Sequence, residues 1–488
     1  MVQTYFNETL VFSKEHAVMP YRFKKFEKDD VVRYLVTTDN GGWAALDDDE
    51  FKQLRLERIE DEQLFHVLEE KGIILTNHNF NIIEDNYRKR YGFLFHGTSL
   101  HIIIPTLRCN HKCIYCHSSA KSMHDKSVDM DEKTAKKTLE FIFQTPAKSI
   151  TIEFQGGDST LVWDLFEYIV KEAKEMNKIF QKNIRFALVT NLILMDHDKI
   201  EFCCNEDVDI CTSIDGPAEV HDFNRKMENG SNSYETVSKN KKKIEQEYSK
   251  NVSAIMVTTK QSLPYYKEIV DEYVSHKSCS LQVKYINKLG FAENTWQNIG
   301  YSMDEFIDFW KKSADYMIEL NKNGTKIMDR FIGLILQKVL TKQDPSFLDF
   351  RSPCGIVIGQ LAYNHNGDIY CCDEGRNFDM FKIGNLFENN YKDVISSEKS
   401  QQLISASMCE NYLCDNCVYK PYCGTCPVIA YAEQNNIIPK LGQFSKCKLL
   451  KFQFDYAFEK LLFDPEVKEI FFDWLNNLNT NKNEHLHN

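Results

Sequence analysis

The stretch that decides the fold reads LHIIIPTLRCNHKCIYC and covers residues 100–116. Its first part, Leu100 to Ile104, is an apolar run with the length of a buried β-strand. Three cysteines follow, Cys109, Cys113 and Cys116, with the spacing C-x3-C-x2-C. A [4Fe–4S] cluster normally takes four cysteine ligands, so three leave one iron open to a ligand from outside the protein. The stretch therefore predicts a strand followed by an iron–sulfur site. The alternative is a zinc site, although structural zinc usually draws paired C-x2-C units.

Five more apolar runs follow the first, each separated from the next by a polar turn and a helical stretch. They are Ile150 to Phe154, Ile184 to Thr190, Val208 to Ile214, Val252 to Thr258 and Leu281 to Ile286. Strands that alternate with helices favour a parallel sheet with right-handed crossovers. About six repeats predict an α/β fold with a partial (β/α)6 barrel over residues 96–290. Catalytic groups of such barrels lie at the C-terminal ends of the strands.

Residues 1–95 predict a winged-helix-like α+β module. The expected strands are Val31 to Thr37, Trp43 to Leu46 and Ile73 to Leu75, and the expected helices lie around Glu50 to Leu54 and Glu62 to Lys71. No catalytic constellation occurs in this part of the chain. The module is therefore either a stabilising cap or a peptide-recognition site.

Composition excludes several function classes. The chain has 488 residues, enough for two or three domains, with 59 basic and 71 acidic residues and a net charge of -12. The basic residues are scattered, which argues against nucleic acid as the main partner. No run approaches the ~20 apolar residues of a membrane helix, and no signal peptide is evident, so we expect a cytoplasmic protein without membrane contact. Sixteen cysteines in a reducing compartment favour metal or redox chemistry.

The remainder of the chain divides into three regions. A helical connector is expected at residues 291–350, with helices at Met303 to Asn321 and Lys326 to Lys342. A cysteine-rich region covers residues 351–450, and a C-terminal helix and tail cover residues 451–488, with the helix at Phe452 to Leu462. The spaced cysteines of the second region are Cys354, Cys372, Cys414, Cys417, Cys423, Cys426 and Cys447. Their C-x2-C pairs would also satisfy structural zinc.

The first cysteine motif, with Tyr115 before its last cysteine, resembles the signature of the radical S-adenosylmethionine superfamily. The resemblance implies that Cys109, Cys113 and Cys116 hold a [4Fe–4S] cluster. The amino and carboxylate groups of S-adenosylmethionine would chelate the open iron. The backbone around Tyr115 would lie against the adenine.

Later segments resemble further motifs of the same superfamily. Phe154-Gln-Gly-Gly-Asp-Ser159 is similar to the Gly-Gly-Glu-Pro loop that holds the methionine amino group, with Asp158 and Ser159 in place of Glu and Pro. Ser213-Ile-Asp-Gly-Pro217, with His221-Asp222 and Arg225, resembles a block of the peptide-modifying branch. The cofactor-binding residues implied are Tyr115, Gly156, Gly157, Asp158, Asn191, Ser213 and Arg225. Ser213 would contact the ribose and Arg225 the methionine carboxylate, whereas Asp215 and His221 are expected to be structural.

The C-terminal cysteines resemble the SPASM extension, which binds two auxiliary [4Fe–4S] clusters. The family order implies that Cys354, Cys372 and Cys426 hold the first cluster, and that Cys414, Cys417, Cys423 and Cys447 hold the second. The chain has C-x2-C-x5-C-x2-C where the family has C-x2-C-x5-C-x3-C, a difference that falls at Cys426. The first cluster lacks a fourth ligand unless Cys371 or Cys409 supplies it. Asp373 follows Cys372 as a catalytic base does in anaerobic sulfatase-maturing enzymes, so Asp373 is the predicted catalytic residue.

Several segments narrow the resemblance to the His-Xaa-Ser system radical SAM maturases. They include Arg22-Phe23, Thr38 to Trp43 and Pro421 to Pro427. The resemblance implies modification of a ribosomally made precursor peptide by a 5′-deoxyadenosyl radical. It also implies an electron donor such as flavodoxin or ferredoxin, and a partner radical SAM maturase. The alternatives are another SPASM reaction, such as sulfatase maturation, and a non-enzymatic metal-binding scaffold.

Overall fold

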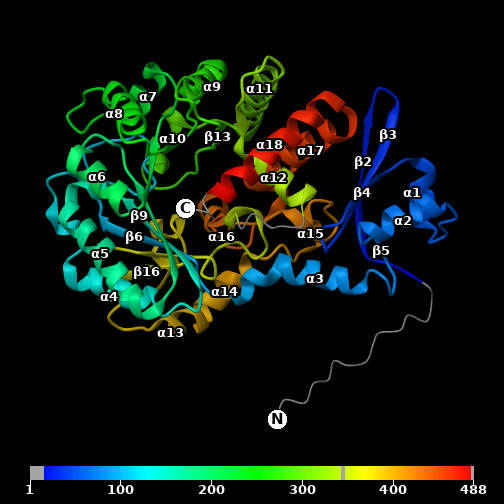
Figure 1. Ribbon diagram of the computed structural model, residues 1–488, viewed down its shortest axis with the longest axis horizontal. Helices are drawn as coiled ribbons and strands as arrows, with labels where there is room; N and C mark the ends of the chain where they lie inside the picture. The colour runs from blue at the N-terminus through cyan, green and yellow to red at the C-terminus, as the bar shows by residue number, and fades with distance from the viewer. Residues whose placement is uncertain (1–15, 342–346, 485–488) are drawn as a thin grey trace, which may run out of the picture.

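The computed structural model describes residues 16–341 and 347–484. Its centre is an eight-stranded sheet with the order β12-β11-β10-β9-β6-β15-β16-β17 (Figure 1). The strands are β6 (Leu100–Thr106), β9 (Ser149–Gly156), β10 (Asn183–Val189), β11 (Val208–Ser213), β12 (Val252–Ile255), β15 (Gln360–Tyr363), β16 (Asp368–Tyr370) and β17 (Lys382–Asn385). The first six in the sheet order are parallel, and β16 and β17 add an antiparallel pair at one edge.

Five of the six predicted apolar runs are confirmed as strands of this sheet. β6 is buried almost throughout, as expected of a parallel strand covered on both faces. The run from Leu281 to Ile286 differs, because only β13 (Ser280–Leu281) is a strand and it pairs with β14 (Met328–Asp329) outside the large sheet. The chain is thus a mixed α/β fold, and the six-stranded outline of the barrel stays a prediction.

Helices connect the parallel strands and cover the sheet. They are α4 (Glu132–Ile142), α5 (Trp163–Phe180), α6 (His197–Asn205), α7 (Ala218–Asn224), α8 (Tyr234–Glu247), α9 (Tyr266–Ser275) and α10 (Phe291–Ile299). Asp131 and Asp196 begin α4 and α6, because each carboxylate accepts a hydrogen bond from a first-turn amide. On α5, Phe166, Ile169 and Val170 form one buried face against the sheet.

The cysteine-rich region contributes to the same sheet as the predicted barrel. Residues Gln360 to Tyr363 of β15 pair in parallel with Leu100 to Ile103 of β6. The region continues with α13 (Tyr391–Ser396), α14 (Glu398–Ala406), α15 (Tyr412–Asp415) and α16 (Pro427–Gln434). Because β15 extends the sheet, the residues that follow it are brought beside the ends of the parallel strands.

The N-terminal module contains a three-stranded antiparallel sheet and three helices. The sheet has the order β2-β3-β4, and β1 pairs with β5. The elements are β1 (Ala17–Val18), β2 (Tyr21–Lys28), β3 (Val31–Thr38), β4 (Trp43–Leu46), α1 (Asp48–Arg55), α2 (Glu62–Glu70), β5 (Ile74–Leu75) and α3 (Phe80–Tyr91). The predicted strands and helices are confirmed, whereas β2 and α3 were not predicted. The winged-helix description stays a prediction.

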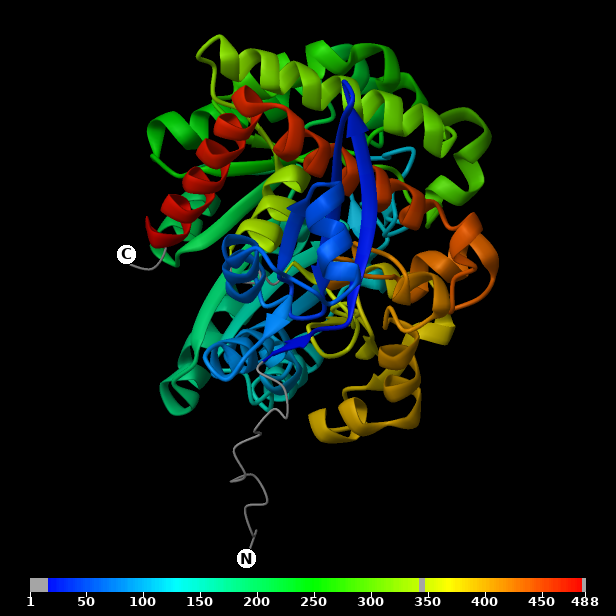
Figure 2. The same ribbon diagram turned by 90° about the vertical axis from the view of Figure 1, so that its right-hand side faces the viewer.

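A helical layer joins the module to the rest of the molecule. It consists of α11 (Met303–Lys322), α12 (Arg330–Leu340), α17 (Ser445–Phe463) and α18 (Pro465–Glu484). Phe26 and Leu35, from β2 and β3, belong to the same hydrophobic core as Phe454 and Phe458 of α17, and Figure 2 shows the β2–β3 hairpin beside this layer. α12 begins later than predicted because Asp329 caps it, and α17 begins before Cys447. None of the helices in the described ranges is long and apolar enough to cross a membrane.

Candidate active site

A pocket lies where the parallel strands end. Its wall contains Cys109, Cys113 and Cys116 after β6, Gly156 at the end of β9, Asn191 after β10 and Ser213 at the end of β11. Every predicted cofactor-binding residue lines it, namely Tyr115, Gly156, Gly157, Asp158, Asn191, Ser213 and Arg225. The C-terminal ends of parallel strands are where ligands bind in α/β folds.

The three-cysteine loop is fixed by its neighbours. The Lys112 amide donates to the Lys226 carbonyl at 2.8 Å, and the Ile114 amide to the Asn224 carbonyl at 3.0 Å. The Phe291 amide at the start of α10 donates to the Cys116 carbonyl at 2.9 Å. Burial raises the pKa of the Cys113 thiol to about 12, so iron binding must displace its proton.

Tyr115 and Arg225 are held by Asp215, which is fully buried. The Tyr115 hydroxyl donates to Asp215 Oδ2 at 2.5 Å, and Arg225 Nε lies 3.2 Å from Asp215 Oδ1. The Arg225 guanidinium also lies 5.1 Å from the centre of the Tyr115 ring. Burial would lower the pKa of Arg225, but the Asp215 carboxylate raises it, so Arg225 stays a cation in the pocket wall.

The glycine pair after β9 is required by the protein's own backbone. A Cβ at Gly157 would lie 1.9 Å from the Arg108 carbonyl oxygen, and one at Gly156 would lie 2.6 Å from that of Thr106. Gly156 also has a φ of +113°, which favours glycine. The pair therefore lets the end of β9 pack against the segment that leads into the cysteine loop.

Asp158 and Asn191 connect neighbouring strand ends. The buried Asp158 carboxylate accepts hydrogen bonds from the Asn191 amide at 2.8 Å and from the Thr190 hydroxyl at 3.0 Å. Asn191 Nδ2 in turn donates to Asn110 Oδ1 at 2.6 Å and lies 3.8 Å from Cys109 Sγ. Burial raises the pKa of Asp158. Its carboxylate thus shapes the pocket by holding these loops together.

The cysteine-rich region supplies another wall of the pocket through Asp373 and Glu374. Asp373 Oδ2 lies 2.9 Å from His117 Nε2, and Asp373 Oδ1 lies 2.8 Å from an Arg376 guanidinium nitrogen. Burial would raise the pKa of Asp373, but His117 and Arg376 hold it well below its usual range. Burial and the nearby Asp349 and Asp373 carboxylates raise the pKa of Glu374. The predicted catalytic residue, Asp373, therefore lines the same pocket as the three cysteines.

Sequence reasoning missed several residues of the pocket wall. His117, Lys284 and Glu374 line it, and Asp215 orients two of its members. His117 directly follows Cys116, which is the one signal that could have drawn attention to it.

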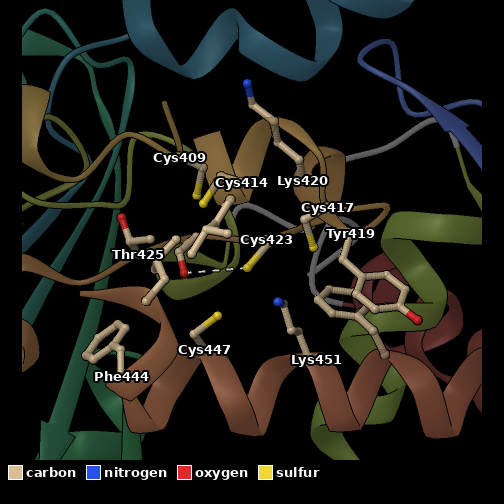
Figure 3. Close-up of a pocket in the computed structure, with 14 residues that line it drawn as sticks. Cys409, Cys414, Cys417, Tyr419, Lys420, Cys423, Thr425, Phe444, Cys447 and Lys451 are labelled. Atoms are coloured by element: carbon tan, nitrogen blue, oxygen red, sulfur yellow. Dashed lines mark hydrogen bonds between the residues drawn. The ribbon is translucent and has the colours of Figure 1, made fainter. Parts of the chain in front are cut away.

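The cysteines of the C-terminal region form two groups. In the first group, the thiol of Cys372 helps to raise the pKa of Cys354, and both thiols help to raise that of Cys426. Cys371 Sγ lies 3.9 Å from Cys372 Sγ. The second group lines one pocket and consists of Cys409, Cys414, Cys417, Cys423 and Cys447 (Figure 3). Of the two residues considered as a fourth ligand for the first group, Cys371 lies beside it, whereas Cys409 lies in the second.

The residues that line the two pockets fit the iron–sulfur clusters and the polar cofactor that the motifs imply. Thiols are the usual ligands of iron–sulfur clusters. Both ring nitrogens of His111, which lines the active-site pocket, are buried without a hydrogen-bond partner among the described residues, and such atoms suit a polar ligand. Within residues 16–341 and 347–484, no three His, Cys, Asp or Glu side chains are arranged to hold a single metal ion.

Comparison with known proteins identifies relatives of the chain. Residues 103–273 match the model of the radical SAM superfamily, in which SAM denotes S-adenosylmethionine. An uncharacterized protein of Methanocaldococcus jannaschii is 33% identical over 294 residues, which cover 59% of this chain and 90% of the relative. The cysteine-type anaerobic sulfatase-maturating enzyme of Clostridium perfringens is 24% identical over 366 residues, covering 72% and 94%. The radical SAM cyclopropyl synthase TigE of Paramaledivibacter caminithermalis is 21% identical over 447 residues, covering 84% and 90%.

Two solved structures share the fold. Native anSMEcpe with bound AdoMet aligns with a TM-score of 0.63 and 20% identity, over 78% of this chain and 100% of the other. Streptococcus suis SuiB bound to its precursor peptide SuiA aligns with a TM-score of 0.52 and 16% identity, over 83% and 94%.

Proposed function

The chain belongs to the radical SAM superfamily, and we propose that within it the protein is a peptide maturase of the His-Xaa-Ser type. Membership implies S-adenosylmethionine and a [4Fe–4S] cluster, and Cys109, Cys113 and Cys116 would hold that cluster. When bound, the two supply a 5′-deoxyadenosyl radical. The protein's own contribution is to bind and orient the cofactors and the substrate, and to exclude water from them.

The observation that carries the proposal is the composition of the pocket. The pocket is lined by the three-cysteine loop and, on another wall, by Asp373 and Glu374, which directly follow Cys372. A substrate held between these walls lies near the radical source on one side. On the other side it lies near the first C-terminal cysteine group, where an electron from the product could be accepted.

Within the pocket, each residue has a role that follows from its contacts. Arg225 presents a cation that suits the methionine carboxylate, and its ion pair with Asp215 holds the guanidinium at the pocket. Tyr115 is held beside it, and Ser213, which lines the same pocket, would contact the ribose. Asp373, paired with His117 and Arg376, is a carboxylate that could take a proton from the substrate once His117 shifts.

The two C-terminal cysteine groups would hold auxiliary [4Fe–4S] clusters. Cys354, Cys372 and Cys426, with Cys371 beside them, would form the first site. Cys414, Cys417, Cys423 and Cys447 would form the second. Cys426 departs from the family spacing by one residue, but the nearby thiols of Cys354 and Cys372 both help to raise its pKa, which supports its place in the first site.

The N-terminal module would recognise the precursor peptide. β2 and β4 are the outer strands of its sheet, and neither outer edge has a strand partner among the described residues. An extended leader could add a strand there. The structure of SuiB with its precursor peptide SuiA shares the fold over 83% of this chain, which supports a peptide substrate. An electron donor such as flavodoxin or ferredoxin, a partner radical SAM maturase and a cytoplasmic location complete the proposal.

A second candidate is sulfatase maturation. It is favoured by the 24% identity to the sulfatase-maturating enzyme over 94% of that relative. The test incubates reconstituted enzyme, S-adenosylmethionine and dithionite with a His-x-Ser precursor peptide or with a sulfatase peptide. A mass change in the His-x-Ser peptide alone supports the maturase proposal, and formylglycine in the sulfatase peptide alone supports the alternative. Neither product, with no 5′-deoxyadenosine, would favour a non-enzymatic scaffold.

A further inference from the structure

The second C-terminal pocket contains one thiol more than a cluster needs. Five cysteines line it, and a [4Fe–4S] cluster has four iron atoms to ligate. In Figure 3 the sulfurs of Cys409 and Cys414 lie side by side, with Cys423 and Cys447 below them and Cys417 across the pocket. The thiols of Cys414 and Cys423 also lie near enough to that of Cys409 to shift its pKa. Cys409 and Cys414 therefore reach the same corner of the pocket.

The two neighbouring cysteines are anchored differently. Cys409 is 1% exposed, and its amide donates to Ser352 Oγ at 2.8 Å, which fixes it to the interior. Cys414 lies on the one-turn helix α15, where Tyr412 is 80% exposed and Leu413 is 53% exposed. A side chain on such a short surface helix can move at lower cost than one in the interior.

We infer that Cys409 and Cys414 are alternative ligands of one iron in the second auxiliary cluster, an inference that rests on the proposed function. In the exchange, the bond from iron to Cys414 Sγ breaks and a bond to Cys409 Sγ forms. The departing Cys414 thiolate takes the proton that Cys409 releases, and no electron is transferred. The pocket would thereby keep four thiolate ligands with either cysteine bound.

The test compares iron content and the electron paramagnetic resonance of dithionite-reduced protein among cysteine variants of the full chain. Cys409→Ala and Cys414→Ala should each retain the iron of the unaltered protein. The double variant should lose about four iron atoms per chain, the content of one cluster. Cys447→Ala, in the same pocket but without an interaction with Cys409, should lose the same amount. Cys279→Ala, an exposed cysteine outside both groups, is the matched control and should lose none. Circular dichroism verifies that each variant is folded.

Two results would overturn the inference and are separable from failure of the proposed function. If either Cys409→Ala or Cys414→Ala alone loses as much iron as the double variant, the two residues are not interchangeable. If the double variant keeps all its iron while Cys447→Ala loses it, neither residue is a ligand. Full iron retention in Cys447→Ala would instead mean that the pocket holds no cluster, which contradicts the proposed function itself.

Discussion

Asp215 shows how one buried charge can organise a candidate active site. Its carboxylate accepts hydrogen bonds from Tyr115, Asn224 Nδ2 at 3.0 Å and the Val257 amide at 3.2 Å, and it pairs with Arg225. The two oxygens thus hold residues that follow β6, β11 and β12. Its role is to position the side chains that face the cofactor.

Asp215→Ala should destabilise the protein strongly, because it leaves the Arg225 cation buried without its counterion. Loss of one partner from a buried pair costs about 3–5 kcal/mol. Asp209→Ala is the matched control, because Asp209 pairs with Arg185 on the surface and such pairs contribute about 1 kcal/mol or less. In thermal unfolding, the melting temperature of the Asp215 variant should fall by about 3–5 °C, and that of the control by about 1 °C or less. Equal decreases in melting temperature would show that the fold does not depend on Asp215 as the counterion of Arg225.

Asp329 should make the stability of the protein depend on pH. It is fully buried at the start of α12, where Oδ1 accepts a hydrogen bond from the Ile332 amide at 2.8 Å. Burial raises its pKa from 3.8 to about 7. The folded state therefore binds this proton more tightly than the unfolded state does. The resulting contribution to the free energy of unfolding is fully present below about pH 4 and is lost as pH rises through 7.

Asp329→Asn should remove that dependence while keeping the helix cap, because asparagine also caps helices well. The difference in unfolding free energy between the variant and the unaltered protein should favour the variant increasingly between about pH 4 and pH 7, by up to about 4 kcal/mol. Thermal or urea unfolding across that pH range measures it. A difference that does not change with pH would show that Asp329 is ionised in the fold.

At the scale of elements, α10 clamps the cysteine loop. Its preceding residue Gly290 has a φ of +56°, and a Cβ there would lie 2.5 Å from the Cys116 carbonyl oxygen and 2.6 Å from that of His117. Thr295 Oγ1 adds a hydrogen bond of 2.8 Å to the Ile114 carbonyl. The loop therefore cannot keep its place unless this position is glycine.

Gly290→Ala should displace Cys116 and lower the iron held by the first cysteine motif, together with cleavage of S-adenosylmethionine. We expect at least a ~10-fold loss of 5′-deoxyadenosine formation, since displacements of about 1 Å can cost more than that in a reacting geometry. The control is Gly230→Ala, which has a similarly left-handed φ of +84° but whose Cβ would meet no described atom within 4 Å. If both variants lose activity equally, backbone strain and not contact with the loop is responsible.

The elements differ in how well the sequence predicts them. The strand β6 carries its own signal as a nearly continuous buried run, whereas β9, β10 and β11 do so through apolar residues that alternate with polar or less buried ones. β15 is only four residues long, and its partner β6 lies more than 250 positions earlier, so no local pattern reveals the pairing. β2 has five charged residues among eight and reads as a loop. The cysteines of the site were predicted from spacing, whereas the role of Asp215 depends on burial and partners that only the tertiary structure provides.

At the scale of the whole molecule, the N-terminal module docks on the loop that carries Cys417. Arg22 Nε donates to the Asp415 carbonyl at 2.6 Å, and Thr37 Oγ1 donates to the Val418 carbonyl at 2.7 Å. The Tyr422 hydroxyl donates to the Gly41 carbonyl at 3.0 Å. The loop between Cys414 and Cys423 is thus both the wall of the second cysteine pocket and the seat of the module.

Loading of the second cysteine pocket should therefore order the module. In hydrogen exchange followed by mass spectrometry, the amides of β3 should exchange several-fold more slowly in reconstituted protein than in metal-free protein. The difference should disappear in Cys423→Ala. Helix α5, which packs against the large sheet, serves as the internal reference. Unchanged exchange in β3 would mean that the module docks independently of the cluster.

We propose that the chain cleaves S-adenosylmethionine at the first cysteine motif. The most direct test reconstitutes the protein anaerobically with iron and sulfide, adds dithionite and S-adenosylmethionine, and measures 5′-deoxyadenosine. The control replaces Cys109, Cys113 and Cys116 by Ala together. We predict product from the unaltered protein and none above background from the triple variant. Absence of product from fully reconstituted protein, or equal product from the triple variant, would contradict the claim.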